Sequence, residues 1–127
     1  MKPRQLRLLA HNVRSLWNVG AFFRTCDAFA VEHIYLSGYT GTPPRKEITK
    51  TAIGAEEFVT WEKVTDPVAL LQELKRDGWT IVGLEITTDA VNLDAYKPRK
   101  KCCLVVGHEL TGVPEDQLVL CLSLIHI

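Results

Sequence analysis

WTIVGLEI at residues 79–86 and CCLVV at residues 102–106 are the stretches that decide the fold. Both are short and almost wholly apolar, without the alternation of polar and apolar residues that marks a strand with one wet face. Such runs are typical of strands that are buried on both faces of a parallel sheet. Because helices must then cover both faces, the two stretches predict an α/β domain.

Strand and helix patterns alternate along the rest of the chain. Further strands are expected at residues 6–10, 34–36 and 58–61, and helices at residues 18–29, 47–53, 67–77 and 113–120. Asn18 is a candidate N-cap for the first helix, and Asp66 followed by Pro67 suits the start of the third. This order predicts one domain over residues 1–127, with a mostly parallel sheet flanked by helices.

Composition describes an ordinary globular domain. The 127 residues are 46% hydrophobic and 24% charged, and 15 basic residues balance 15 acidic ones. No stretch approaches the ~20 consecutive apolar residues of a membrane helix, and the N-terminal residues lack the pattern of a secretory signal. We therefore expect a cytoplasmic protein that does not associate with membranes.

The cysteines and histidines show no spacing typical of metal ligands. The four cysteines include no C-x-x-C pair, and the four histidines include no H-x-x-x-H pair. Cys102 and Cys103 begin an apolar run, where a free thiol behaves as a small hydrophobic side chain. We expect no metal site.

Charge is distributed unevenly along the chain. Residues 1–50 contain eight Lys and Arg against three Asp and Glu, a net charge of +5, and the remaining 77 residues carry −5. A basic N-terminal part permits local contact with a polyanion although the whole chain is neutral.

Polar residues follow the first predicted strand, where parallel α/β sheets usually bind ligands. They run from His11 to Arg14 and continue to Asn18 and Arg24 in the next helix. Arg24 lies nearly two helical turns beyond Asn18, so the spacing alone does not place both at one site. An arginine beside apolar helix positions is either a buried ion-pair partner or a group that recognises phosphate or carboxylate, and the sequence leaves both open.

A second polar segment, GHELTGVPE at residues 107–115, follows the strand at 102–106. Gly107 permits a close approach of backbone or ligand, and Gly112 permits a turn before the helix that Pro114 can begin. The spacing matches neither a dinucleotide fingerprint nor a Walker motif. A cofactor loop and a plain strand-to-helix turn both remain open, and Glu109 favours the former because a carboxylate there can accept hydrogen bonds from a ligand or fix an arginine.

Three segments together resemble a known enzyme family. They are Asn18-Val19-Gly20-Ala21 with Arg24-Thr25, Lys50-Thr51-Ala52 through Gly54-Ala55-Glu56, and Leu104-Val105-Val106-Gly107 with Glu109 and Gly112. In this order and spacing they resemble the SpoU/TrmH family of RNA ribose 2′-O-methyltransferases, part of the SPOUT superfamily with a trefoil-knotted α/β fold. The resemblance covers residues 8–121 and includes two of the family's three motifs.

The resemblance implies transfer of a methyl group from S-adenosylmethionine to a ribose 2′-hydroxyl of tRNA or rRNA. It implies catalytic roles for Arg24, Asn18 and Glu109. The arginine would hold a phosphate and position the ribose, while the other two orient it. A free arginine is a poor base because its pKa exceeds ~12, so positioning is its expected physical role.

The same resemblance implies further contacts with the cofactor and the RNA. Cofactor contacts are expected from the strand end at Leu84 and Glu85 and from the glycines Gly107 and Gly112. The basic residues expected to hold the RNA backbone are Arg14, Arg45, Lys46 and Lys50. The full-length form is expected to be a homodimer.

The C-terminal residues depart from the family pattern. The residues after Cys121, LSLIHI, do not resemble the expected continuation, and the third motif is absent. We expect a non-native tail from Leu122 onward with exposed apolar side chains, and an incomplete knot. A catalytically inactive fragment or an RNA-binding module of the same fold is therefore the alternative to an active enzyme. A Rossmann-like oxidoreductase is disfavoured, because Asn12-Val13-Arg14 stands where a glycine fingerprint would be.

Overall fold

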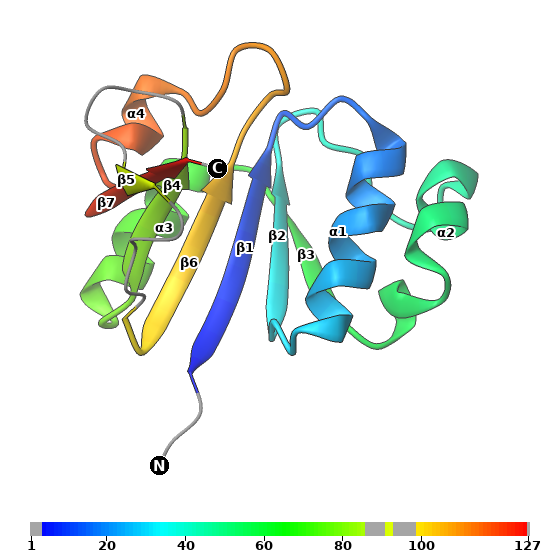
Figure 1. The fold of residues 1–127 in the computed structure, drawn as a ribbon. Coiled ribbons are helices and arrows are strands. Elements are labelled where there is room, and N and C mark those ends of the chain that lie inside the picture. The colour runs from blue at the N-terminus through cyan, green and yellow to red at the C-terminus, as the bar shows by residue number, and fades with distance from the viewer. Residues whose placement is uncertain (1–3, 86–90, 93–98, 127) are drawn as a thin grey trace.

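A computed structural model describes residues 4–85, 91–92 and 99–126, and it shows one twisted sheet with helices on both faces (Figure 1). Its seven strands are β1 (Gln5–His11), β2 (His33–Ser37), β3 (Thr60–Val64), β4 (Thr80–Leu84), β5 (Val91–Asn92), β6 (Lys101–Val106) and β7 (Ser123–His126). Their order is β3-β2-β1-β6-β4-β7-β5, and every pairing between these described strands is parallel. The prediction of an α/β domain with a parallel sheet flanked by helices is confirmed.

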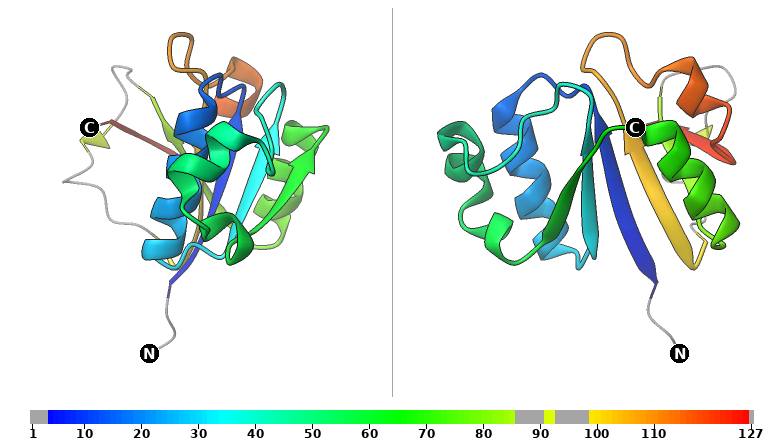
Figure 2. Two further views of the ribbon diagram at one scale, coloured as in Figure 1. Left: turned by 90° about the vertical axis from the view of Figure 1, so that its right-hand side faces the viewer. Right: turned by 180° about the vertical axis from the view of Figure 1, so that it is seen from behind.

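Helices cover the two faces at different ends of the sheet (Figure 2). They are α1 (Leu16–Ala28), α2 (Lys46–Ala52), α3 (Pro67–Arg76), α4 (Glu115–Leu118) and a short 3-10 helix, η1 (Ala55–Glu57). The first two lie on one face beside β1, β2 and β3, and α3 and α4 lie on the other.

Alternate residues of β1 belong to two separate cores. Leu8 and Ala10 pack in one core with Phe23 of α1, whereas Leu9 packs in the other with Leu71 of α3. This alternation follows from the two-residue period of a strand. The centre of the sheet is therefore buried on both faces, as the apolar runs predicted.

The first helix begins earlier than the sequence pattern predicted. Ser15, not Asn18, is the N-cap, and its hydroxyl accepts the N–H of Asn18 at 3.1 Å. Serine and asparagine both cap helices, so the sequence pattern allowed a start at Asn18 and missed the first turn of α1. The predicted start of α3 is confirmed, since the Asp66 carboxylate accepts the N–H of Ala69 at 3.0 Å.

Two other predicted boundaries are wrong. The strand expected at residues 58–61 runs instead over Thr60–Val64, and Phe58 is 77% exposed. Phe58 closes the η1 turn by donating its N–H to the carbonyl of Ala55 at 3.0 Å, so its aromatic β-propensity is overridden locally. The helix expected at residues 113–120 is only the four-residue α4. Residue 86, the expected end of β4, lies outside the described residues.

The C-terminal residues take part in the sheet. β7 pairs with β4 on one side and with β5 on the other, and the N–H of Glu85 donates to the carbonyl of Ile125 at 3.0 Å. Ile125 is buried at 6% exposure, whereas Leu122 is 62% exposed. The expectation of exposed apolar side chains is therefore confirmed for Leu122 and wrong for Ile125, whose strand pairing carries it into the sheet.

Candidate functional site

Three loops meet at the carboxyl edge of the sheet, the upper edge in Figure 1. β1 pairs in parallel with both β2 and β6, and the register places His11 beside Ser37 and Ala10 beside Val106. The loops that follow these strands are therefore neighbours, although they are far apart in sequence. This is the edge at which parallel α/β sheets bind ligands.

Glu109 joins the loop after β6 to the start of α1. Its carboxylate accepts the backbone N–H of Ser15 at 3.1 Å and that of Arg14 at 3.3 Å, and the side-chain amide of Asn18 lies 3.5 Å from it. Both N–H groups lie immediately before α1, where the positive end of the helix dipole favours a negative charge. The structure thus brings Asn18 and Glu109 together, but the groups that Glu109 fixes are main-chain N–H groups and not an arginine side chain.

These contacts change the acidity of Glu109. Burial alone would raise the pKa of its carboxyl group. The hydrogen bonds from backbone N–H groups, including those of Ser15 and Arg14, and from the Asn18 amide outweigh it, so the pKa lies below its ordinary value. The group is therefore a carboxylate at neutral pH.

The loop that carries Glu109 is a closed turn. His108 and Gly112 form an antiparallel bridge, with N–H to carbonyl distances of 3.2 and 2.9 Å. Inside the turn, Nδ1 of His108 accepts the N–H groups of Leu110 and Thr111 at 3.0 and 3.2 Å. The turn is thus held by its own hydrogen bonds before it contacts anything else.

The two glycines of this turn are required by protein contacts. A Cβ atom on Gly107 would lie 2.3 Å from the carbonyl oxygen of Gly112. A Cβ atom on Gly112, which has a φ of +75°, would lie 2.1 Å from the carboxylate of Glu85. That carboxylate accepts the N–H of Val113 at 2.9 Å and so ties the turn to the end of β4. The glycine spacing alone therefore does not distinguish a cofactor loop from a plain turn.

Arg24 lies apart from Glu109 within the chain. It is exposed and lines a hollow of about 480 Å³ between α1 and α2, together with Lys50, Phe29 and Ile53. The alternative of a buried ion-pair partner is therefore wrong. An exposed guanidinium in a hollow with a second cation suits the recognition of an anion such as phosphate.

The remaining predicted basic residues are divided between two places. Arg14 lines a hollow of about 370 Å³ that also contains Glu109. Arg45 and Lys46 are exposed at the start of α2, where Arg45 forms a loose ion pair with Glu47 at 3.8 Å.

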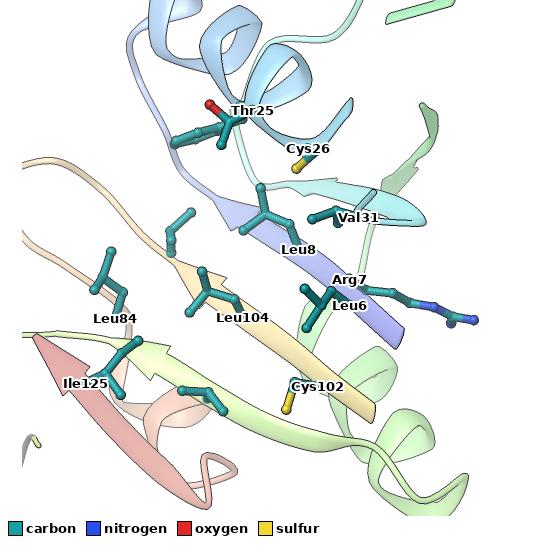
Figure 3. A pocket seen from close by; sticks show the side chains of 13 residues that line it. Leu6, Arg7, Leu8, Thr25, Cys26, Val31, Leu84, Cys102, Leu104 and Ile125 are labelled. Carbon is teal, nitrogen blue, oxygen red and sulfur yellow. The ribbon is translucent and has the colours of Figure 1, made fainter. Parts of the chain in front are cut away.

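Leu84 lies in apolar surroundings on the sheet face that carries α1. The hollow there has a volume of about 460 Å³, and its walls include Leu104 and Ile125 from the strands and Thr25 and Cys26 from α1 (Figure 3). Leu84 therefore offers apolar contact only, whereas its neighbour Glu85 turns to the polar loop.

No helix among the described residues is long and apolar enough to cross a bilayer. Within the same residues, no group of three or more His, Cys, Asp or Glu is arranged to hold a metal ion.

Sequence reasoning missed the loop after β2. Thr40 is 2% exposed, and its hydroxyl accepts the N–H of Val13 at 3.0 Å and donates to the carbonyl of Ala10 at 3.2 Å. These contacts fasten the loop after β2 to the loop after β1. The available signal was Tyr39, a large aromatic residue within a stretch of turn-forming residues.

Comparisons with known proteins agree with this geometry. A model of the SpoU rRNA Methylase family matches residues 5–127. The tRNA (guanosine(18)-2′-O)-methyltransferase of Aquifex aeolicus is 35% identical over 117 residues, which are 91% of this chain and 54% of that protein. The crystal structure of the A. aeolicus TrmH/SpoU tRNA modifying enzyme superposes with a TM-score of 0.85 at 32% identity, covering 98% of this chain and 64% of the other.

A more distant solved structure shares the fold. The SpoU methyltransferase AviRb from Streptomyces viridochromogenes, crystallised with the cofactor AdoMet, has a TM-score of 0.87 at 18% identity. The match covers 100% of this chain and 49% of AviRb. The chain thus spans about half to two thirds of the length of these proteins.

Proposed function

The chain belongs to the SpoU rRNA Methylase family, and from that premise we propose that it supplies the catalytic domain of an RNA ribose 2′-O-methyltransferase. The contact of Glu109 with the start of α1 carries the proposal, because it joins the two polar segments of the family resemblance at one edge of the sheet. The relatives' names specify tRNA and rRNA, so we propose a tRNA or rRNA substrate.

The side chains of the hollow that contains Arg24 and of the hollow that contains Glu109 suit a reaction that depends on positioning. Arg24 presents an exposed guanidinium that holds a phosphate of the RNA. Asn18 and Glu109 orient the ribose so that its 2′-hydroxyl faces the methyl donor. Glu109 can accept a hydrogen bond from a ribose hydroxyl with a lone pair that its main-chain contacts leave free.

The residues present fit S-adenosylmethionine as the cofactor. When bound, this molecule supplies an electrophilic methyl group on a positively charged sulfur. Gly107 and Gly112 are partly exposed at the strand end and expose main-chain atoms there, and the Glu85 carboxylate beside them suits a cation. Leu84 adds an apolar contact at the end of β4.

The basic residues of the N-terminal part hold the RNA backbone in this proposal. Arg14 binds RNA phosphate at the hollow that contains Glu109, and Lys50 does so at the hollow that contains Arg24. Arg45 and Lys46 extend this surface along the start of α2. Binding through phosphate contacts should weaken steeply as the salt concentration rises.

The decisive experiment measures transfer of a labelled methyl group from S-adenosylmethionine to bulk RNA. Arg24→Ala should lower the rate about 100-fold or more, as the loss of one transition-state contact does in other enzymes. Arg76→Ala is the matched control, because Arg76 is also an exposed helix arginine, at the end of α3. Full activity in Arg24→Ala, or no transfer by a full-length version, would overturn the proposal.

Three further measurements test the wider proposal. Calorimetric titration with S-adenosylmethionine separates an enzyme from an inactive fragment or RNA-binding module, since only the enzyme needs this ligand. We further propose that the full-length protein is a cytoplasmic homodimer that works without a metal ion. Sedimentation tests the dimer, and transfer that survives a chelator tests the absence of a metal.

A further inference from the structure

Tyr39 is an exposed aromatic residue beside the hollow that contains Glu109. The residue is 58% exposed, and its ring lies edge-on to the ring of His108, with 6.3 Å between the ring centroids and an interplanar angle of 76°. His108 and Leu110 line the hollow together with Glu109, and Leu110 is 87% exposed. Large side chains thus line or border a depression that also holds the charged groups of Arg14 and Glu109.

The main chain on the N-terminal side of Tyr39 is held against the loop that follows β1. The N–H of Tyr39 donates to the side-chain oxygen of Asn12 at 3.1 Å. Gly38 has a φ of +64°, and a Cβ atom there would lie 1.8 Å from the same Asn12 oxygen. The main chain before Tyr39 is therefore packed tightly against the loop that follows β1.

The main chain on the C-terminal side of Tyr39 is also held by hydrogen bonds. Thr40 is buried and hydrogen-bonded to the loop after β1. The Lys63 ammonium donates to the carbonyl of Thr40 at 3.1 Å and to that of Gly38. Burial lowers the pKa of this lysine. Tyr39 therefore has a well-held main chain and a ring that folding leaves exposed, an arrangement typical of binding residues on rigid loops.

The chemistry of the depression matches that of a nucleotide. The flat ring of Tyr39 beside it offers stacking. Within the depression, the cation of Arg14 suits a phosphate, and the carboxylate of Glu109 suits a ribose hydroxyl. Its volume of about 370 Å³ lies in the range of small-ligand sites.

We propose that the ring of Tyr39, bordered by His108 and Leu110, forms a stacking platform for a nucleobase of the RNA, and that the ribose of the same nucleotide faces Glu109. The inference rests on the proposed function and adds to it the place of the target base. A base can reach the platform only from a single strand or after leaving its helix. Stacking accepts every base, so the platform does not by itself select one.

Fluorescence anisotropy with two labelled strands tests the platform in the 127-residue chain. One strand is a short unstructured oligouridylate, and the other has the same length and backbone but no bases. Tyr39→Ala should weaken binding of the base-containing strand roughly 5- to 150-fold, the effect of losing one stacked base elsewhere. Tyr39→Phe keeps the ring and should bind both strands like wild type.

Matched controls separate stacking from damage to the fold. Phe58→Ala removes an equally large exposed ring that precedes β3 at the opposite edge of the sheet, and should change neither affinity. Tyr39→Ala should bind the base-free strand as tightly as the wild type does. Equal affinity of Tyr39→Ala and wild type for the oligouridylate overturns the platform, as does an equal loss on both strands. Wild-type chain that binds neither strand contradicts RNA as the partner and so overturns the proposed function itself.

Discussion

Replacing Gly112 by alanine should destabilise the domain through a contact that it shares with Glu85. Alanine at a φ of +75° costs about 1–2 kcal/mol of backbone strain. Its Cβ would also lie 2.1 Å from the Glu85 carboxylate. That carboxylate must then move and release the N–H of Val113, whose charged hydrogen bond contributes about 1.5–3 kcal/mol. Gly112→Ala should therefore lower the free energy of unfolding by about 2.5–5 kcal/mol in total.

The double variant Glu85→Ala/Gly112→Ala isolates the shared part. Glu85→Ala alone should cost about 1.5–3 kcal/mol, because it removes the same hydrogen bond. The double variant should then cost no more than Gly112→Ala alone, which gives a coupling of about 1.5–3 kcal/mol. Urea unfolding measures all four free energies, and Glu85→Gln, which keeps an acceptor, should recover part of the loss. Costs that add to within about 0.5 kcal/mol would refute the shared contact.

Three other perturbations test the contacts that hold the loops and helices. Thr40→Val should lower the free energy of unfolding by about 1–3 kcal/mol, because the buried N–H of Val13 loses its acceptor. Thr49→Val, at an exposed position, is the control and should change it by less than about 0.5 kcal/mol. Urea unfolding measures both. Folding lowers the pKa of Glu109, so its carboxylate contributes in full to the free energy of unfolding above the ordinary pKa of 4.5. This contribution is lost as the pH falls through the lower pKa of the folded state. Glu109→Gln should remove this part of the acid dependence in thermal melts over a pH series. Gly20→Ala should cost about 1–3 kcal/mol, measured by urea unfolding, because its Cβ would lie 2.3 Å from the main-chain carbonyl of Ile48 in α2.

The layers of the fold could be predicted because they depend on local patterns. The run at 102–106 lies in β6, between β1 and β4, and a core covers each of its faces. Its uniformly apolar sequence indicates this burial directly. Ends of elements depend on competing local bonds. Ser15 and Asn18 are both good caps, and only the path of the preceding loop selects Ser15.

The candidate site could be predicted only in part. Residue types at strand ends identified Glu109 and Asn18, and the structure brings these two together. Their contact joins residues 91 positions apart, and no local pattern encodes such a distance. The position of Arg24 on its helix could be predicted from local spacing. The hollow that it lines could not, because that hollow depends on how α2 packs against α1.

The turn at residues 107–113 is held by a carboxylate on each side, and this has a consequence for function. Glu85 fixes it to β4, on the side proposed for the cofactor, and Glu109 fixes it to α1, on the side proposed for the ribose. Its internal bridge between His108 and Gly112 makes the turn a single unit. We therefore expect a displacement that begins at Gly112 to move Glu109 as well, because the bridge links Gly112 to the residue that precedes Glu109. Cofactor binding and ribose positioning should accordingly fail together in Gly112→Ala, whereas Asn18→Ala should spare the cofactor.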